Sequence, residues 1–88
     1  MAWKLLLTKP AQKNLQRISN PDHDRLVATL RAMEDDPYHG DVTFLRNISP
    51  ALRRRVGNWR ILFDLDTTQQ LIIVHAITRR TTTTYRKR

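Results

Sequence analysis

The positions of the apolar residues divide the chain into helical and extended segments. In residues 10–18 apolar side chains recur at spacings of three and four, which predicts one face of an amphipathic helix. A second stripe of this kind covers residues 26–33, with Asn20 as the expected cap and Pro21 as the first helical residue. Pro37 is expected to end this helix. The short break between the two segments predicts an antiparallel helix hairpin.

Shorter apolar runs predict the strands. In residues 59–66 successive side chains point to opposite faces of a strand, so that Arg60 lies on the face opposite to Trp59. Residues 70–78 are apolar on both faces, which is typical of a central strand. By the same criteria residues 3–8 and 52–56 are extended, and residues 42–45 form either a short strand or a turn.

The order of these segments predicts an α+β domain of two layers that occupies residues 1–88. An N-terminal strand precedes the helix hairpin, which should pack on one face of an antiparallel sheet completed by a C-terminal three-stranded meander. The other face of the sheet is then open, and Arg60 is expected to project from it. No internal repeat or domain boundary is visible.

The net charge of the chain comes entirely from its second half. Residues 46–88 hold ten Lys or Arg against two Asp, whereas residues 1–45 hold six basic and six acidic residues, so the whole net charge of +8 follows residue 45. A basic sheet beside neutral helices favours a polyanionic partner such as nucleic acid, whose affinity for the sheet depends on salt.

Other features limit the class of protein. The chain has no cysteine, which excludes disulfides and thiolate chemistry. The longest apolar run, residues 71–77, is too short to span a bilayer, and no signal peptide is visible. His23, His39 and His75 are scattered, so no metal site is expected. We therefore expect a cytoplasmic protein without a membrane partner.

Two runs in the second half resemble the RelE/ParE superfamily of toxins from type II toxin–antitoxin systems, and in particular its RelE-like branch. They are RRRVGNWRILFDLD and IIVHAITRRTTTTY. The shared features are a basic strand, a turn with glycine, an aromatic–arginine pair, an apolar last strand, a basic turn and a C-terminal tyrosine. They correspond to Arg53 and Arg55, Gly57, Trp59 and Arg60, residues 71–77, Arg79 and Arg80, and Tyr85.

The resemblance implies a RelE-like fold over nearly the whole chain and a ribosome-dependent endonuclease that cuts mRNA in the ribosomal A site. In that reaction the ribose 2′-OH attacks the adjacent phosphate, and neither a metal nor a cofactor is needed. The implied partners are a cognate antitoxin that neutralises the toxin, mRNA, and the 70S ribosome with its 16S rRNA. Operator DNA, contacted through the antitoxin complex, is a further partner that the resemblance allows.

The resemblance also assigns roles to single residues. Arg60 and Arg79 are expected to bind the scissile phosphate, and Tyr85 to act as a base and to stack on a nucleobase. Tyrosine has a pKa near 10, so neighbouring arginines that favour the phenolate belong to this mechanism. The general acid stays open, because arginine does not readily release a proton. The residues expected to bind RNA are Arg53, Arg55, Arg80, Arg86 and Lys87.

Two other functions stay open at this level. One is a ParE-like inhibitor of DNA gyrase on the same fold, which would need no nuclease site. The other is a nucleic-acid-binding module without catalysis. The combination of Arg60, Arg79 and Tyr85 favours the nuclease. Arg54 is expected on the face opposite to Arg53 and Arg55, and His75 is interpreted as a structural sheet histidine.

Overall fold

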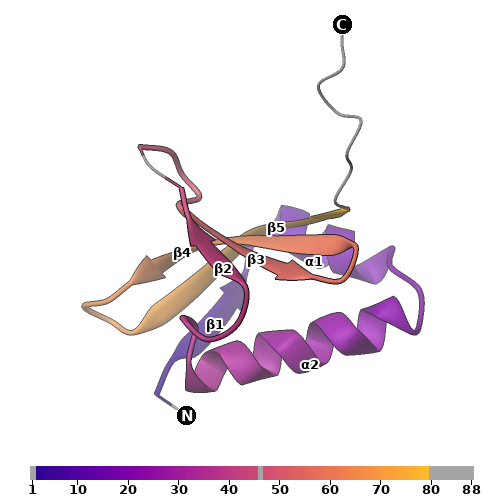
Figure 1. The fold of residues 1–88 in the computed structure, drawn as a ribbon, viewed down its shortest axis with the longest axis horizontal. Coiled ribbons are helices and arrows are strands. Elements are labelled where there is room, and N and C mark those ends of the chain that lie inside the picture. The colour runs from indigo at the N-terminus through magenta and orange to yellow at the C-terminus, as the bar shows by residue number, and fades with distance from the viewer. Residues whose placement is uncertain (1, 46, 80–88) are drawn as a thin grey trace, which may run out of the picture.

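The computed structural model describes residues 2–45 and 47–79. Two helices pack against one sheet (Figure 1), which confirms the predicted α+β class with two layers. The elements in chain order are β1 (Lys4–Leu7), α1 (Lys9–Gln16), α2 (Asp22–Asp35), β2 (Val42–Phe44), β3 (Leu52–Val56), β4 (Trp59–Asp66) and β5 (Leu71–Arg79).

The sheet has the strand order β1-β5-β4-β3-β2. Strands β2 to β5 form an antiparallel meander, so the segment at residues 42–45 contributes a strand and the meander has four strands instead of three. The expectation of an entirely antiparallel sheet is wrong, because β1 runs parallel to β5. A parallel neighbour needs a long crossover, and here the helices and the first three strands of the meander supply it.

Polar side chains mark the starts of both helices. The Thr8 hydroxyl caps α1 by accepting a hydrogen bond from the backbone amide of Ala11 at 3.4 Å. The second helix begins one residue later than predicted, with Pro21 in the cap position. Asn20 still satisfies an amide of the first turn, because its Oδ1 accepts from Asp24 N at 3.2 Å. After the turn at residues 17–21, α2 runs back along the sheet (Figure 1).

The core lies between the sheet and the helices. Helix α1 packs on β5 and β1, and α2 packs on β1 and β3. A hydrogen bond from Ile77 N to Asn14 Oδ1, 3.0 Å long, joins β5 to α1. Within the described residues, neither helix is long and apolar enough to cross a membrane. The buried apolar residues are Ala11, Ile18, Leu26, Leu30, Met33, Leu52, Val56, Ile61, Phe63, Ile72, Val74 and Ile77.

The two faces of the sheet differ in burial. Ile61 and Phe63 of β4 are fully buried against the helix layer, whereas Arg60, Leu62 and Asp64, which alternate with them, are only half-buried. All strand residues in the buried core belong to the helix-covered face, as the strand register shows. We call the other side the open face. The predicted placement of Arg60 on it is confirmed.

Candidate nucleic-acid interface

Three arginines converge on the open face. The hairpin between β3 and β4 is closed by a two-residue turn in which Gly57 has a φ of +58°, a conformation that favours glycine. This turn sets a register in which Arg55 pairs with Arg60 and Arg53 pairs with Leu62. Paired residues share a face, so Arg53, Arg55 and Arg60 form one group, which we call the arginine cluster.

The arginine cluster keeps unused hydrogen-bond donors. The Nε atoms of Arg53 and Arg60 are buried and have no hydrogen-bond partner in the described part of the chain. Arg55 lies near a carboxylate, with its Nε 3.8 Å from Asp41 Oδ2. Buried N–H groups normally find an acceptor, and guanidinium groups pair well with phosphate oxygens. The cluster is therefore suited to bind an anion with several oxygens.

Arg54 lies on the helix-covered face of the sheet, opposite to Arg53 and Arg55, as the alternation predicted. It pairs with Ile61 of the core face, and its Nη1 donates to the backbone oxygen of His39 at 2.6 Å. The guanidinium lies against Gly40, where a Cβ would collide with it and where φ is +96°. Arg54 therefore fastens the loop before β2 and is not available to the arginine cluster.

Arg79 is held on the other side of the sheet from Arg60. Its Cζ lies 4.8 Å from the centre of the Trp59 ring, in a cation–π contact. Trp59 in turn donates from Nε1 to Asp22 Oδ2 at the start of α2, 3.0 Å away. The structure thus does not bring Arg79 together with Arg60 in the described conformation. The predicted site residues Arg80, Tyr85, Arg86 and Lys87 lie outside the described residues.

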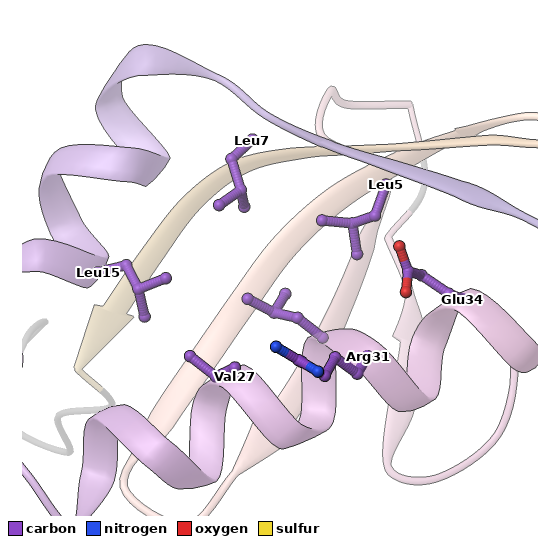
Figure 2. A pocket seen from close by; sticks show the side chains of 7 residues that line it. Leu5, Leu7, Leu15, Val27, Arg31 and Glu34 are labelled. Atoms are coloured by element: carbon purple, nitrogen blue, oxygen red, sulfur yellow. The ribbon is translucent and has the colours of Figure 1, made fainter.

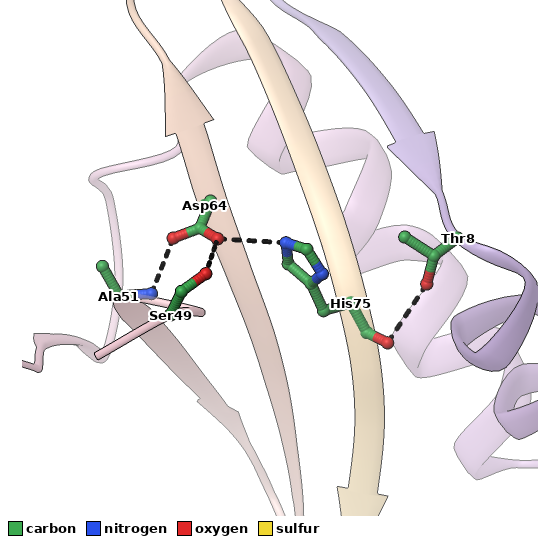
Figure 3. Close-up of polar contacts among 5 residues, drawn as sticks. All are labelled: Thr8, Ser49, Ala51, Asp64 and His75. Atoms are coloured by element: carbon green, nitrogen blue, oxygen red, sulfur yellow. Dashed lines mark hydrogen bonds and ion pairs between the residues drawn. The ribbon is translucent and has the colours of Figure 1, made fainter.

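A second polar group on the open face surrounds Asp64 (Figure 3). Its Oδ1 accepts from Ala51 N at 2.7 Å, and its Oδ2 accepts from Ser49 Oγ at 2.8 Å. His75 Nε2 lies 3.0 Å from the same Oδ2. Burial alone would raise the pKa of Asp64, but the hydrogen bonds from Ala51 and Ser49, together with His75, lower it below the ordinary value.

Sequence patterns did not reveal the pair of Asp64 and His75. Alternation placed Asp64 on the outward side of its strand, but His75 was interpreted as a structural histidine. The two residues meet because the register of β4 and β5 sets Asp64 opposite Ile73, which makes His75, two residues further along β5, its diagonal neighbour on the same face. A polar residue within an otherwise apolar strand was the available signal, but no local pattern indicated this register.

An apolar groove lies on the helix side of the molecule (Figure 2). Its volume is about 180 Å³, and Arg31 and Glu34 of α2 are its charged residues. Leu5 and Leu7 of β1, Leu15 of α1, and Val27 and Leu30 of α2 form the rest of the wall. Because the groove is apolar and the sheet separates it from the open face, it does not form part of the candidate site for a polyanion.

Comparison with known proteins identifies the fold of the chain but assigns it to no sequence family. No family model matches the sequence, and no curated protein matches it. Solved structures do match. A chain of the archaeal RelE–RelB complex from Pyrococcus horikoshii superimposes with a TM-score of 0.80 at 20% identity, covering 93% of this chain and 99% of that chain.

Two further structures agree. A chain of the toxin–antitoxin complex RelBE2 from Mycobacterium tuberculosis has a TM-score of 0.78 at 17% identity, over 91% of this chain and 100% of that one. The isolated E. coli RelE toxin has a TM-score of 0.77 at 13% identity, over 91% of this chain and 86% of the toxin. The chain therefore has the fold of RelE toxins, as the resemblance predicted.

Proposed function

We propose that this protein is the toxin of a toxin–antitoxin pair and that it cleaves mRNA in the A site of the ribosome. The observation that carries the proposal is the arginine cluster of Arg53, Arg55 and Arg60 on the open face of a sheet with the fold of RelE toxins. A small domain that gathers cationic donors on its uncovered face is suited to a phosphodiester backbone.

The cluster would act on the reaction through charge. When the ribose 2′-OH attacks the adjacent phosphate, negative charge increases on the phosphoryl oxygens, and fixed guanidinium groups stabilise it. Arg60, whose Nε has no partner in the described part of the chain, is the proposed ligand of the scissile phosphate. Arg53 and Arg55 would hold the neighbouring backbone.

The remaining predicted residues follow β5 and belong to the proposal by resemblance. Arg79 would have to leave the Trp59 ring to reach a phosphate bound by Arg60, since the two arginines lie on opposite faces. Tyr85 is proposed as a base or stacking residue, and Arg80, Arg86 and Lys87 as RNA-binding residues. The proposed partners are a cognate antitoxin, mRNA and the 70S ribosome with its 16S rRNA, in the cytoplasm.

Primer extension on a reporter mRNA tests this proposal. Purified protein is added to ribosomes programmed with the mRNA and, in parallel, to the same mRNA without ribosomes. New cuts at the A-site codon should appear with ribosomes only. Arg60→Gln should reduce cutting by about 100-fold or more, which corresponds to the removal of one strong charge interaction from the transition state. Arg31→Gln, on the helix side, is the matched control and should cut like the wild type.

The other outcomes separate the alternatives. Cuts without ribosomes would show a general ribonuclease. Stalled complexes of DNA and gyrase without mRNA cuts would show a gyrase inhibitor. Salt-dependent binding of many RNA and DNA sequences without any cut would show a binding module.

A further inference from the structure

His75 of β5 faces the open face and lies at a bulge in the strand. Val74 pairs with Phe63 and Ala76 pairs with the preceding residue, Leu62, so His75 is the extra residue between them. It extends beside Asp64, and 37% of its side chain is exposed. On the other side of its strand, the His75 carbonyl oxygen accepts a hydrogen bond from the Thr8 hydroxyl at 3.1 Å. The backbone of His75 is thus held by Thr8, while its imidazole ring is partly exposed.

Asp64 decides which ring nitrogen of His75 carries hydrogen in the neutral form. A carboxylate can only accept, so the nitrogen 3.0 Å from it, Nε2, must donate. The lone pair of the neutral ring is then on Nδ1, which lies on the side of the ring away from Asp64 (Figure 3). In the described residues no hydrogen bond occupies Nδ1. This arrangement leaves a basic nitrogen with a fixed orientation and, among those residues, no partner.

His75 lies close enough to the arginine cluster to share a ligand with it. Leu62 stands between them, since it pairs with Arg53 on one side and with Ala76, next to His75, on the other. Two steps between strands correspond to about 10 Å, and long side chains from both ends can reach one nucleotide across that span. A phosphate held by Arg53 or Arg60 would bring its neighbouring ribose over the Leu62 side chain, toward His75.

We propose that His75, oriented by Asp64, is the base of the RNA cleavage reaction at the open face. This inference rests on the proposed function and assigns the base to a residue other than Tyr85. His75 Nδ1 takes the proton of the ribose 2′-OH as the 2′-oxygen forms a bond to phosphorus. The bond from phosphorus to the 5′-oxygen breaks, and that oxygen takes a proton from water. The products are a 2′,3′-cyclic phosphate and a 5′-hydroxyl, and His75 returns its proton to solvent.

A histidine is better suited than a tyrosine to act as the base. A neutral imidazole accepts a proton directly on its free nitrogen, whereas a tyrosine hydroxyl must first lose its own proton. The charged groups on the open face that accompany His75 are Asp64, Asp66 and Arg60 of β4, Arg53 and Arg55 of β3, and Lys4 of β1.

The test is the dependence of single-turnover cleavage on pH, measured on programmed ribosomes with the full chain. The wild-type rate should rise from acid toward neutral pH and then level. His75→Gln can still donate to Asp64 but has no nitrogen that accepts a proton, so it should lose the acid limb and about 100-fold or more in rate. His39→Gln, a change of an exposed loop histidine, should keep the wild-type profile. Tyr85→Phe should keep the acid limb.

Asp64 is a positioning residue in this proposal. Asp64→Asn should lower the rate while the acid limb remains, because the His75 imidazole is still present but its ring is no longer held in one tautomer. The affinity for programmed ribosomes should not change in His75→Gln, because the step it removes follows binding. A purely structural role for His75 would reduce the affinity and leave the pH profile intact.

The outcomes distinguish this inference from the function it rests on. A wild-type protein that cleaves with ribosomes while His75→Gln shows the same rate and the same acid limb overturns the inference and leaves the proposed function standing. A wild-type cleavage rate that does not fall at acid pH overturns the inference as well. This measurement does not depend on whether any variant folds. A wild-type protein that cuts no mRNA overturns both.

Discussion

Replacing Asp64 by asparagine should destabilise the fold measurably. The carboxylate accepts three hydrogen bonds, from Ala51 N at 2.7 Å, Ser49 Oγ at 2.8 Å and His75 Nε2 at 3.0 Å. Asparagine has one accepting oxygen, so at least one donor meets an NH₂ group and the other bonds lose their charge. Hydrogen bonds to charged groups contribute about 1.5–3 kcal/mol each and neutral ones about 1 kcal/mol. For a site that is partly exposed we expect a net loss of about 2 kcal/mol.

Urea unfolding followed by circular dichroism measures this loss. A domain of this size has a total stability of roughly 5 kcal/mol or a little more, so a loss of about 2 kcal/mol should lower the urea midpoint by about 1.5 M. Asp66→Asn, in the same strand, is the matched control. Asp66 Oδ1 accepts from the amides of Thr68 and Gln69, and an asparagine oxygen can accept the same bonds. Among the described residues, Asp66 Oδ2 accepts only from the exposed Gln69 Nε2, a donor that water can satisfy after the substitution.

The difference between wild type and Asp64→Asn should also depend on pH. The folded-state pKa of Asp64 is lowered, so its stabilising contribution is fully present above the unfolded pKa of about 3.9 and is lost as the pH falls through the lower folded value. The two unfolding curves should therefore approach one another below about pH 4. A loss under about 0.5 kcal/mol, or a difference that stays constant down to about pH 3, would refute the reasoning.

Three further predictions concern the cap, the core and the arginine cluster. Thr8→Ala removes the hydroxyl that accepts from Ala11 N and donates to the His75 oxygen, and thermal unfolding should show a loss of about 1 kcal/mol; an unchanged melting temperature would contradict this. Phe63→Ala empties a fully buried site and should cost about 3–5 kcal/mol in urea unfolding, whereas a cost near 1 kcal/mol would mean that the core is loosely packed there. Arg53→Gln together with Arg60→Gln should reduce the salt slope of RNA binding by about one for each phosphate that is no longer bound, with Arg31→Gln as control; an unchanged slope would place the RNA elsewhere.

The arrangement of helices and strands follows largely from local patterns. Apolar spacing predicts both helices, and alternation in residues 59–66 assigns Ile61 and Phe63 to one face and Arg60 to the other. The same alternation, applied to residues 53–55, separates Arg54 from its neighbours. These features depend on side chains close in sequence, because the period of a helix or strand already decides which side chains share a face.

Contacts between distant segments were decided by the tertiary structure. The parallel pairing of β1 with β5 joins residues 4–7 to residues 71–74, and no local pattern encodes the direction of such a pairing. The stacking of Arg79 on Trp59, which separates Arg79 from Arg60, depends on the position of α2, where Asp22 receives the indole N–H.

By itself, the sequence determined the α+β class, the open face with Arg60 on it, and the separation of Arg54 from Arg53 and Arg55, because these follow from period and order of elements. Only the tertiary structure brought His75 to Asp64. That contact depends on the register that sets Asp64 opposite Ile73, and register arises from how two strands pair over their whole length, which the residues around His75 alone do not specify.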